Sequence, residues 1–418
     1  SGYSFSPAHL ILIPFAIRAY IATQPELRNK WRTPEWLLVC FAIIQPFITF
    51  RNAPSFKDSL GALGLTALGI LAYLAVYMAV CTPRRLKATA RILLWLVLFN
   101  ATFGVLAMLA HIMIHTNIGI STTSRYGNGV FGLSFEHDIF ASTSAVGAIA
   151  FYVLWRERNP IFSPRISGIA FWICSAAMFV GLARGAWLGF GLAFLAVMIV
   201  PRTIRQRIAG VERVGIMLIL AVLLGVGAAY VIGSSDQLTS AFDSVQTKMG
   251  DLVNINTATG VARLGETNQV LDDWKTHKLF GLGTGSYNQL HPLLNQTNYI
   301  GDIYLRALYE TGLLGVTFLI GFLVWLFWPN KALLFNVGDL GPIARALTFG
   351  GAVLTVAYAA TDATLLIWPW ILFALVRAAR VHNDREYDER RAAAKVMVGP
   401  TAPLEPVAPA APPMLPIR

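Results

Sequence analysis

The stretch SLGALGLTALGILAYLAVYMAVC, residues 59–81, contains no charged residue and is rich in Leu, Ala and Gly. An α-helix rises about 1.5 Å per residue, so a run of this length crosses a hydrocarbon core about 30 Å thick. The run lacks the alternation of apolar and polar residues that membrane β-strands show. It therefore predicts a membrane-spanning helix.

The composition of the whole chain agrees with this interpretation. Apolar residues make up 56% of the chain, charged residues only 13%, and the mean hydropathy is +0.58. We therefore expect an all-α polytopic membrane protein with about 11–12 transmembrane helices. The runs that match the length criterion are 8–23, 34–50, 59–81, 91–114, 137–155, 166–184, 185–200, 213–233, 302–328, 344–361 and 363–380.

The basic residues predict the orientation of these spans. Even numbers of spans separate the basic clusters, so the positive-inside rule places all of them on the cytoplasmic side. Topology and anionic lipid headgroups thus account for the net charge of +11, and nucleic acid is not an expected partner. The clusters are RNKWR (28–32), PRRLKATAR (83–91), WRERNP (155–160), PRTIRQR (201–207) and the arginine-bearing tail after Val381.

The same topology predicts the domain organisation. We expect a single transmembrane domain over 1–380, with one large outer loop region, 234–301, between the eighth and ninth spans. Segments 51–58 and 115–136 are shorter outer loops. The chain ends in the Pro/Ala-rich stretch GPTAPLEPVAPAAPPMLPIR, so a disordered cytoplasmic tail is expected over 381–418.

One arginine lies at a position where the positive-inside rule does not predict a cation. In GLARGAWLGF, 181–190, Arg184 falls at the outer end of a span among small and apolar residues. Its side chain either snorkels to the outer headgroups, pairs with a buried carboxylate, or binds an anion at the membrane surface. The planar guanidinium suits phosphate oxygens, and the small neighbours allow close approach of backbones.

A second arginine lies on the same side, in TGVARLGETNQVLDDWKTHKLFGLGTGSYNQL, 259–290. Arg263 opens a predicted helix in the large outer loop, and two arginines on one side of the membrane could clamp a diphosphate. The GLGTG that follows lacks a preceding strand and a GK[ST], so a nucleotide site is not expected. It is interpreted as a tight turn that brings the backbone close to substrate or to a neighbouring helix.

Four further residues are candidates for lining a cavity. Arg306 and Glu310 are one helical turn apart and suit an ion pair, and the cost of charge in a membrane favours a cavity-facing role. Glu136 and His137 begin another span on the outer side, where they either line the same cavity or cap the helix. The sequence has no HExxH pair, so neither a metal site nor a cofactor is expected.

In their order, four segments resemble the O-antigen ligase and O-antigen polymerase superfamily, whose members are integral glycosyltransferases of bacterial envelope polysaccharide synthesis. The resemblance spans about 130–330. The segments are FEHDIFA (135–141), LARGAWLG (182–189), GVARLGETNQVLDDWKTHKLFGLGTGSY (260–287) and DIYLRALYETGLLG (302–315).

The resemblance implies a function at the periplasmic face of the bacterial inner membrane. The donor would be a glycan on undecaprenyl diphosphate, and the acceptor a sugar hydroxyl of a lipid-linked repeat unit or of lipid A core. Arg184 and Arg263 match the family's diphosphate-binding arginines and would neutralise the leaving group in a metal-independent, inverting transfer. Chain-length regulators or other envelope-assembly proteins are possible partners.

The residue that activates the acceptor is not evident. Ligases of the family carry a His eleven positions before the first Gly of the GLLG-type turn, where this chain has Gly301, followed by Asp302. Asp302 could accept the proton, or else cap a helix or pair with Arg306. His291 could act as the base or be a solvated loop residue.

The missing His favours a polymerase, with a ligase that uses His291 as the alternative. A flippase or transporter of lipid-linked glycans is the hypothesis of a different class. Transport favours ionisable residues deep in several spans, whereas the candidates here gather at one membrane face.

Overall fold

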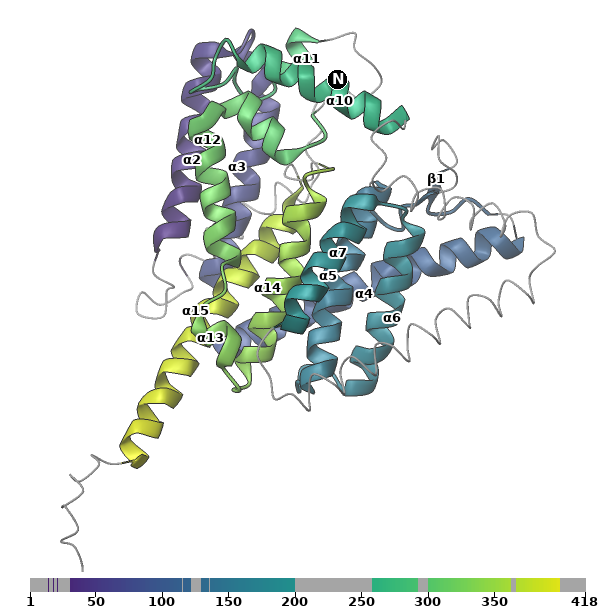
Figure 1. Cartoon of the computed structure of the whole chain (residues 1–418), viewed down its shortest axis with the longest axis vertical. Helices are drawn as coiled ribbons and strands as arrows, with labels where there is room; N and C mark the ends of the chain where they lie inside the picture. The colour runs from purple at the N-terminus through teal and green to yellow at the C-terminus, as the bar shows by residue number, and fades with distance from the viewer. Residues whose placement is uncertain are drawn as a thin grey trace, which may run out of the picture.

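The computed structural model describes residues 31–114, 116–121, 129–134, 136–199, 258–291, 300–361 and 366–398, together with the single positions 14, 18 and 21. Most helices run between two ends of the molecule, and α10 lies across the upper end (Figure 1). The helices are α2 (Thr33–Asn52), α3 (Phe56–Ala79), α4 (Pro83–Ile114), α5 (His137–Glu157), α6 (Pro164–Val180), α7 (Arg184–Ile199), α10 (Ala258–Trp274), α11 (Ser286–Leu290), α12 (Ile303–Phe327), α13 (Lys331–Phe335), α14 (Leu340–Ala357) and α15 (Ile367–Val398).

These helices confirm the predicted class, an all-α polytopic membrane protein. Among the described residues, six helical stretches are long and apolar enough to cross a membrane, and they correspond to α2, α3, α4, α5, α12 with α13, and α14. The apolar helices α6 and α7 are shorter, with 17 and 16 residues. Two short strands, β1 (Ile120–Ser121) and β2 (Gly129–Val130), pair antiparallel in the loop after α4.

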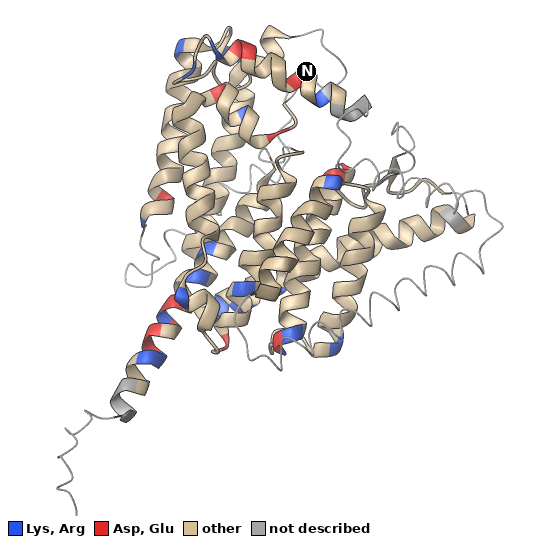
Figure 2. Cartoon of the chain, in the orientation of Figure 1, with Lys and Arg blue, Asp and Glu red and all other residues tan. Residues whose placement is uncertain are grey.

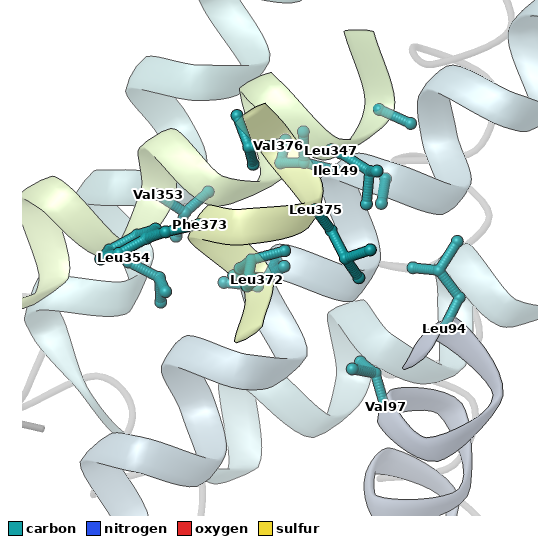
Figure 3. Close-up of a cluster of buried hydrophobic side chains, with 14 of the residues drawn as sticks. Leu94, Val97, Ile149, Leu347, Val353, Leu354, Leu372, Phe373, Leu375 and Val376 are labelled. Atoms are coloured by element: carbon teal, nitrogen blue, oxygen red, sulfur yellow. The ribbon is translucent and has the colours of Figure 1, made fainter. Parts of the chain in front are cut away.

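The core lies where α4, α5, α14 and α15 meet. Every residue of α5 from Ile139 to Leu154 is buried, as expected for a helix that is apolar on all sides. Helix α14 packs against α5, α7 and α15. Figure 3 shows Leu94 and Val97 of α4 facing the cluster formed by the other three helices.

The outer surface of the bundle is apolar, as expected for helices that contact lipid. On α4, Ile92, Trp95 and Phe99 are exposed, and on α2, Phe47 is exposed. A water-soluble protein rarely leaves such a continuous apolar surface uncovered.

The charged residues gather mainly at the two ends and along the second half of α15 (Figure 2). Lys87 pairs with Asp339 at 3.2 Å, and the Asn159 amide donates to the Asp339 carbonyl at 3.1 Å. His382 Nε2 lies 3.1 Å from the Val80 carbonyl. The basic segments 83–91 and 155–160 and the charged tail therefore share one end, as predicted, and its cytoplasmic location stays a prediction.

Two buried ion pairs join neighbouring helices at this end of the fold. Arg377 Nε donates to Glu35 Oε1 at 2.7 Å and joins α15 to α2. Arg345 Nε donates to Glu157 Oε1 at 3.0 Å and joins α14 to α5. Because an unpaired charge is costly in such a place, each pair specifies which helices are neighbours.

The prediction that disorder begins at residue 381 is wrong for 381–398, which continue α15 to Val398. His382 and Asn383 are buried, and Asn330 Nδ2 donates to Asp384 Oδ1 at 3.0 Å. The segment is rich in good helix formers, and these contacts add tertiary support. Residues 399–418 lie outside the described residues.

The predicted spans 8–23 and 213–233 also lie outside the described residues. The predicted span 166–184 ends at Val180, and Arg184 begins the next helix instead of ending this one. The predicted span 302–328 is interrupted at Gly312, which has φ 65° and ψ −166°. That break matters for the site described next.

Candidate functional site

The candidate site lies at the end of the bundle where α5, α7 and α12 begin and α14 ends. A tight turn joins α6 to α7, and in it Leu182 has the positive φ of 53°. The turn makes Arg184 the first residue of α7, and its side chain is half-buried. Arg184 thus lies at a helix N-terminus, where the helix dipole adds positive potential to that of the guanidinium.

The start of α7 packs closely against the end of α14. A Cβ on Gly185 would lie 3.0 Å from the Ala357 carbonyl oxygen and 3.0 Å from the Ala360 Cβ. A larger side chain would push the two helices apart. The prediction that small residues allow close backbone approach around Arg184 is therefore confirmed.

Arg263 contacts the same segment from α10. It lies on α10 with an exposed side chain, and its Nη2 donates to the Ala360 carbonyl at 2.7 Å. This bond uses one of the five N–H groups of the guanidinium. Gly185, the residue after Arg184, packs against Ala360, and Arg263 bonds to Ala360, so Ala360 links the neighbourhoods of two arginines that are 79 positions apart in the sequence.

The start of α5 adds acidic side chains to this place. Glu136 is half-buried before the first turn, and burial and the neighbouring Asp138 raise its pKa, while His137 and Arg263 oppose the rise. His137 Nε2 lies 3.5 Å from Asp138 Oδ1. The Thr361 hydroxyl donates to Asp138 Oδ2 at 3.0 Å. Three segments distant in the chain therefore meet at 360–361.

Asp302 caps α12. Its Oδ1 accepts from the backbone N–H groups of Tyr304 and Leu305 at 2.7 and 3.1 Å. Arg306 Nε donates to Glu310 Oε1 at 3.1 Å. Of the roles expected for Asp302, the structure therefore contains the helix cap, and a role in proton transfer stays a prediction.

His291 is not a solvated loop residue. It is half-buried, its Nε2 lies 2.6 Å from Asp273 Oδ2, and its Nδ1 lies 2.8 Å from Gln269 Nε2. The Tyr309 hydroxyl donates to the same Asp273 oxygen at 3.1 Å. With the Gln269 amide donating to Nδ1, the ring proton lies on Nε2 and is donated to Asp273. Both ring nitrogens are thus occupied, and the ring ties α11 to α10.

The glycine turn at 281–285 packs on α12. The Leu282 N–H donates to the Tyr309 carbonyl at 2.8 Å, and the Gly283 N–H donates to the Glu310 carbonyl at 2.9 Å. A Cβ on Gly281 would lie 2.5 Å from the Gly312 nitrogen, so only glycine fits. The turn approaches a neighbouring helix, which was one of the two expected roles.

Arg306 and Glu310 form the predicted ion pair, and both are buried. Glu310 Oε1 also accepts the Gly285 N–H at 2.8 Å, so the pair holds the glycine turn against α12. A pocket beside the pair is lined in part by Gln45 and Trp370. Arg306 and Glu310 line this pocket together with residues of α2 and α15, and their expected place in a substrate cavity shared with Glu136 and His137 stays a prediction.

Sequence reasoning missed Glu266. This residue lies on α10 three positions after Arg263, and its Oε1 accepts the Gly301 N–H at 2.8 Å. Burial raises its pKa, the Gly301 hydrogen bond and Arg263 lower it, and Asp302 raises it. The helical spacing from Arg263 was the only available signal, because nothing local links Glu266 to residue 301.

Among the residues that the structure describes, no group of three or more His, Cys, Asp or Glu side chains is arranged to hold a metal ion. The absence of a metal from the reaction stays a prediction.

The spanning helices and the arginines gathered at one end define a multi-pass membrane protein with a polar site at one end of its helix bundle. Residues 169–320 match the family model described as O-Antigen ligase, which confirms the resemblance to the O-antigen ligase/polymerase superfamily. The match supports a membrane glycosyltransferase of this type, with lipid-linked glycan substrates at the level of the family. It includes Arg184, Arg263, His291 and Asp302. No curated protein matches the chain.

Proposed function

We propose that the protein transfers a glycan from undecaprenyl diphosphate to a sugar hydroxyl at the periplasmic face of the bacterial inner membrane. One observation carries this proposal. Arg263 bonds to Ala360, Gly185 next to Arg184 packs against the same Ala360, and both arginines lie within the O-antigen ligase family match.

The two arginines suit a lipid-linked diphosphate. Each guanidinium offers several N–H donors in a plane, which matches the oxygens of a phosphate group. Arg184 also stands at the N-terminus of α7, where the helix dipole favours an anion. A polyprenyl chain would extend into the lipid while its diphosphate stays at this end.

The reaction then needs one displacement. The oxygen of the acceptor hydroxyl attacks the anomeric carbon of the donor, and the bond from that carbon to the diphosphate oxygen breaks. The diphosphate leaves with the electron pair, and the arginines stabilise its growing charge. A single displacement inverts the configuration at the anomeric carbon.

A polymerase is the favoured activity, with a second lipid-linked repeat unit as the acceptor. The position of the ligase histidine is Gly301 here, and both nitrogens of the nearest histidine in sequence, His291, are engaged by Asp273 and Gln269. A ligase that transfers the glycan to lipid A core is the alternative.

Reconstitution tests these activities. Purified protein in nanodiscs is given a polyprenyl-diphosphate-linked oligosaccharide alone, then with lipid A core, and the products are separated by size. A ladder in the first reaction supports a polymerase, and transfer only in the second supports a ligase. No covalent product in either reaction would overturn the enzyme proposal, and a flippase assay in liposomes would then test transport.

Arg184→Ala is expected to lose product in the same assay. The matched control is Arg51→Ala, which removes an exposed arginine from the last turn of α2. Arg51 is expected to be dispensable because, in the part of the chain that the structure describes, the side-chain bonds to segment 360–361 come from Arg263 and Asp138 and not from Arg51.

A further inference from the structure

Glu266 and Arg263 present their side chains on the same side of α10. Residues three positions apart on a helix are neighbours, with about 5–6 Å between their Cβ atoms. Arg263 is bonded to the Ala360 carbonyl, and Glu266 is bonded to the Gly301 N–H at the start of α12. This face of α10 therefore carries a cation and a carboxylate side by side over the candidate site.

The carboxylate of Glu266 is held by one oxygen only. Oε1 accepts the Gly301 N–H at 2.8 Å, whereas Oε2 has no hydrogen-bond partner among the described residues. The side chain is half-buried. It is therefore oriented by one bond and has an oxygen left to accept a proton.

Among the described residues, one side of Gly301, the partner of this carboxylate, is open. A Cβ built on Gly301 meets no atom of the described chain within 4 Å. No described atom therefore occupies the side of Gly301 from which we expect a sugar hydroxyl to approach Glu266.

The other two candidate bases are less well placed. Asp302 Oδ1 already accepts two backbone N–H groups of α12. His291 has Asp273 on one ring nitrogen and Gln269 on the other. His291 would have to give up one of these bonds before it could accept a proton from a substrate, and Asp302 already has a structural role as the cap of α12.

We propose that Glu266 is the general base that activates the acceptor hydroxyl. This assignment rests on the proposed glycosyl transfer. Oε2 takes the proton of the hydroxyl while the hydroxyl oxygen bonds to the anomeric carbon. The bond to the diphosphate breaks, its electron pair leaves with the polyprenyl diphosphate beside Arg263, and Glu266 returns the proton to water.

The ionisation of Glu266 agrees with this role. Burial raises its pKa above the ordinary value, which makes the carboxylate a better proton acceptor near neutral pH. The charged and titratable groups that face it are Arg263 on α10, Asp302 at the start of α12, and Tyr287 on α11. Turnover is therefore expected to rise with pH as Glu266 loses its proton, and these neighbouring groups influence the pH at which that happens.

The test is Glu266→Gln in full-length protein in nanodiscs. Glutamine can still accept the Gly301 N–H, so donor binding and thermal unfolding should match those of the wild type. Turnover should fall by about 100-fold or more, as expected for loss of a general base, and its rise with pH should disappear. Asp272→Asn, an exposed acid on the same helix, is the matched control and should keep full turnover.

The outcomes separate the two proposals. Product from the wild type together with undiminished turnover in Glu266→Gln overturns the base assignment alone. A reduced turnover that keeps the wild-type pH profile also overturns it, because Glu266 would then act only on structure. No glycan product from the wild type overturns both the transfer reaction and the base.

Discussion

Replacing Arg184 and Arg263 by alanine, singly and together, is expected to weaken donor binding to different extents. A hydrogen bond to a charged group contributes about 1.5–3 kcal/mol. Arg184 is half-buried at the start of α7, where water competes less, so the upper value applies. Arg263 is exposed and already donates one N–H to the Ala360 carbonyl, so the lower value applies.

These values convert directly to affinities. About 3 kcal/mol for Arg184→Ala corresponds to a Kd roughly 100-fold higher, and about 1.5 kcal/mol for Arg263→Ala to roughly 10-fold. Arg184→Lys should lie between the wild type and Arg184→Ala, because lysine keeps the charge but loses the planar fork.

The assay measures the Kd of a polyprenyl-diphosphate-linked oligosaccharide for protein in nanodiscs, with polyprenol as the uncharged competitor. Arg51→Ala serves as the control for net charge and should bind as the wild type does. If both arginine variants keep the wild-type Kd, the diphosphate is not held at segment 360–361, and the reasoning from the shared segment is wrong.

Three other predictions concern the loops and acids around the site. Gly281→Ala should lower the unfolding temperature in detergent, because residue 281 has φ 67° and its Cβ would meet the α12 backbone, whereas Gly265→Ala, whose Cβ meets nothing, should not. Burial raises the pKa of Glu136. The stability that Glu136 contributes is therefore complete below the ordinary pKa of 4.5 and is lost as the pH rises through the raised pKa. In a plot of unfolding temperature against pH, Glu136→Gln should remove this fall in stability. Gly301→His in the Glu266→Gln background should restore turnover in part, because the new imidazole would enter the space beside residue 301, and no gain over Glu266→Gln would contradict an acceptor hydroxyl at that place.

The break in helix α12 is the point at which the segment before the glycine turn bonds to the helix bundle. Helix α12 opens at Gly312, and the segment before the glycine turn bonds to it there, through the Leu313 N–H to the Lys278 carbonyl at 2.9 Å and the Leu314 N–H to the Leu279 carbonyl at 3.2 Å. A break in a spanning helix leaves backbone groups that need partners, and this segment supplies them. The segment that carries Arg263 and Glu266 is thereby attached to the helix bundle.

The ion pair of Arg306 and Glu310 extends this attachment. Glu310 accepts the Gly285 N–H as well as bonding to Arg306, so loss of either charge would break the bond between the two buried side chains. The pair therefore holds the glycine turn at 281–285 in position, a role that the sequence did not predict.

The sequence by itself determined the class of the protein and the two arginines that are candidates for binding the diphosphate. A run of apolar residues long enough to cross a membrane is a local property, so 59–81 and similar runs could be read directly. Arg184 could be identified as a candidate because the positive-inside rule does not predict a cation at the outer end of a span. The family resemblance then linked it to Arg263, and the family match includes both residues.

Only the tertiary structure decided which residues share the site. The bond from Arg263 to Ala360, the cap that occupies Asp302, and the contacts that engage both nitrogens of His291 all follow from helix packing. Glu266 was missed because its partner, Gly301, is 35 positions away. Hydropathy depends on neighbours along the chain, whereas such contacts depend on which helices pack together, and no local pattern carries that information.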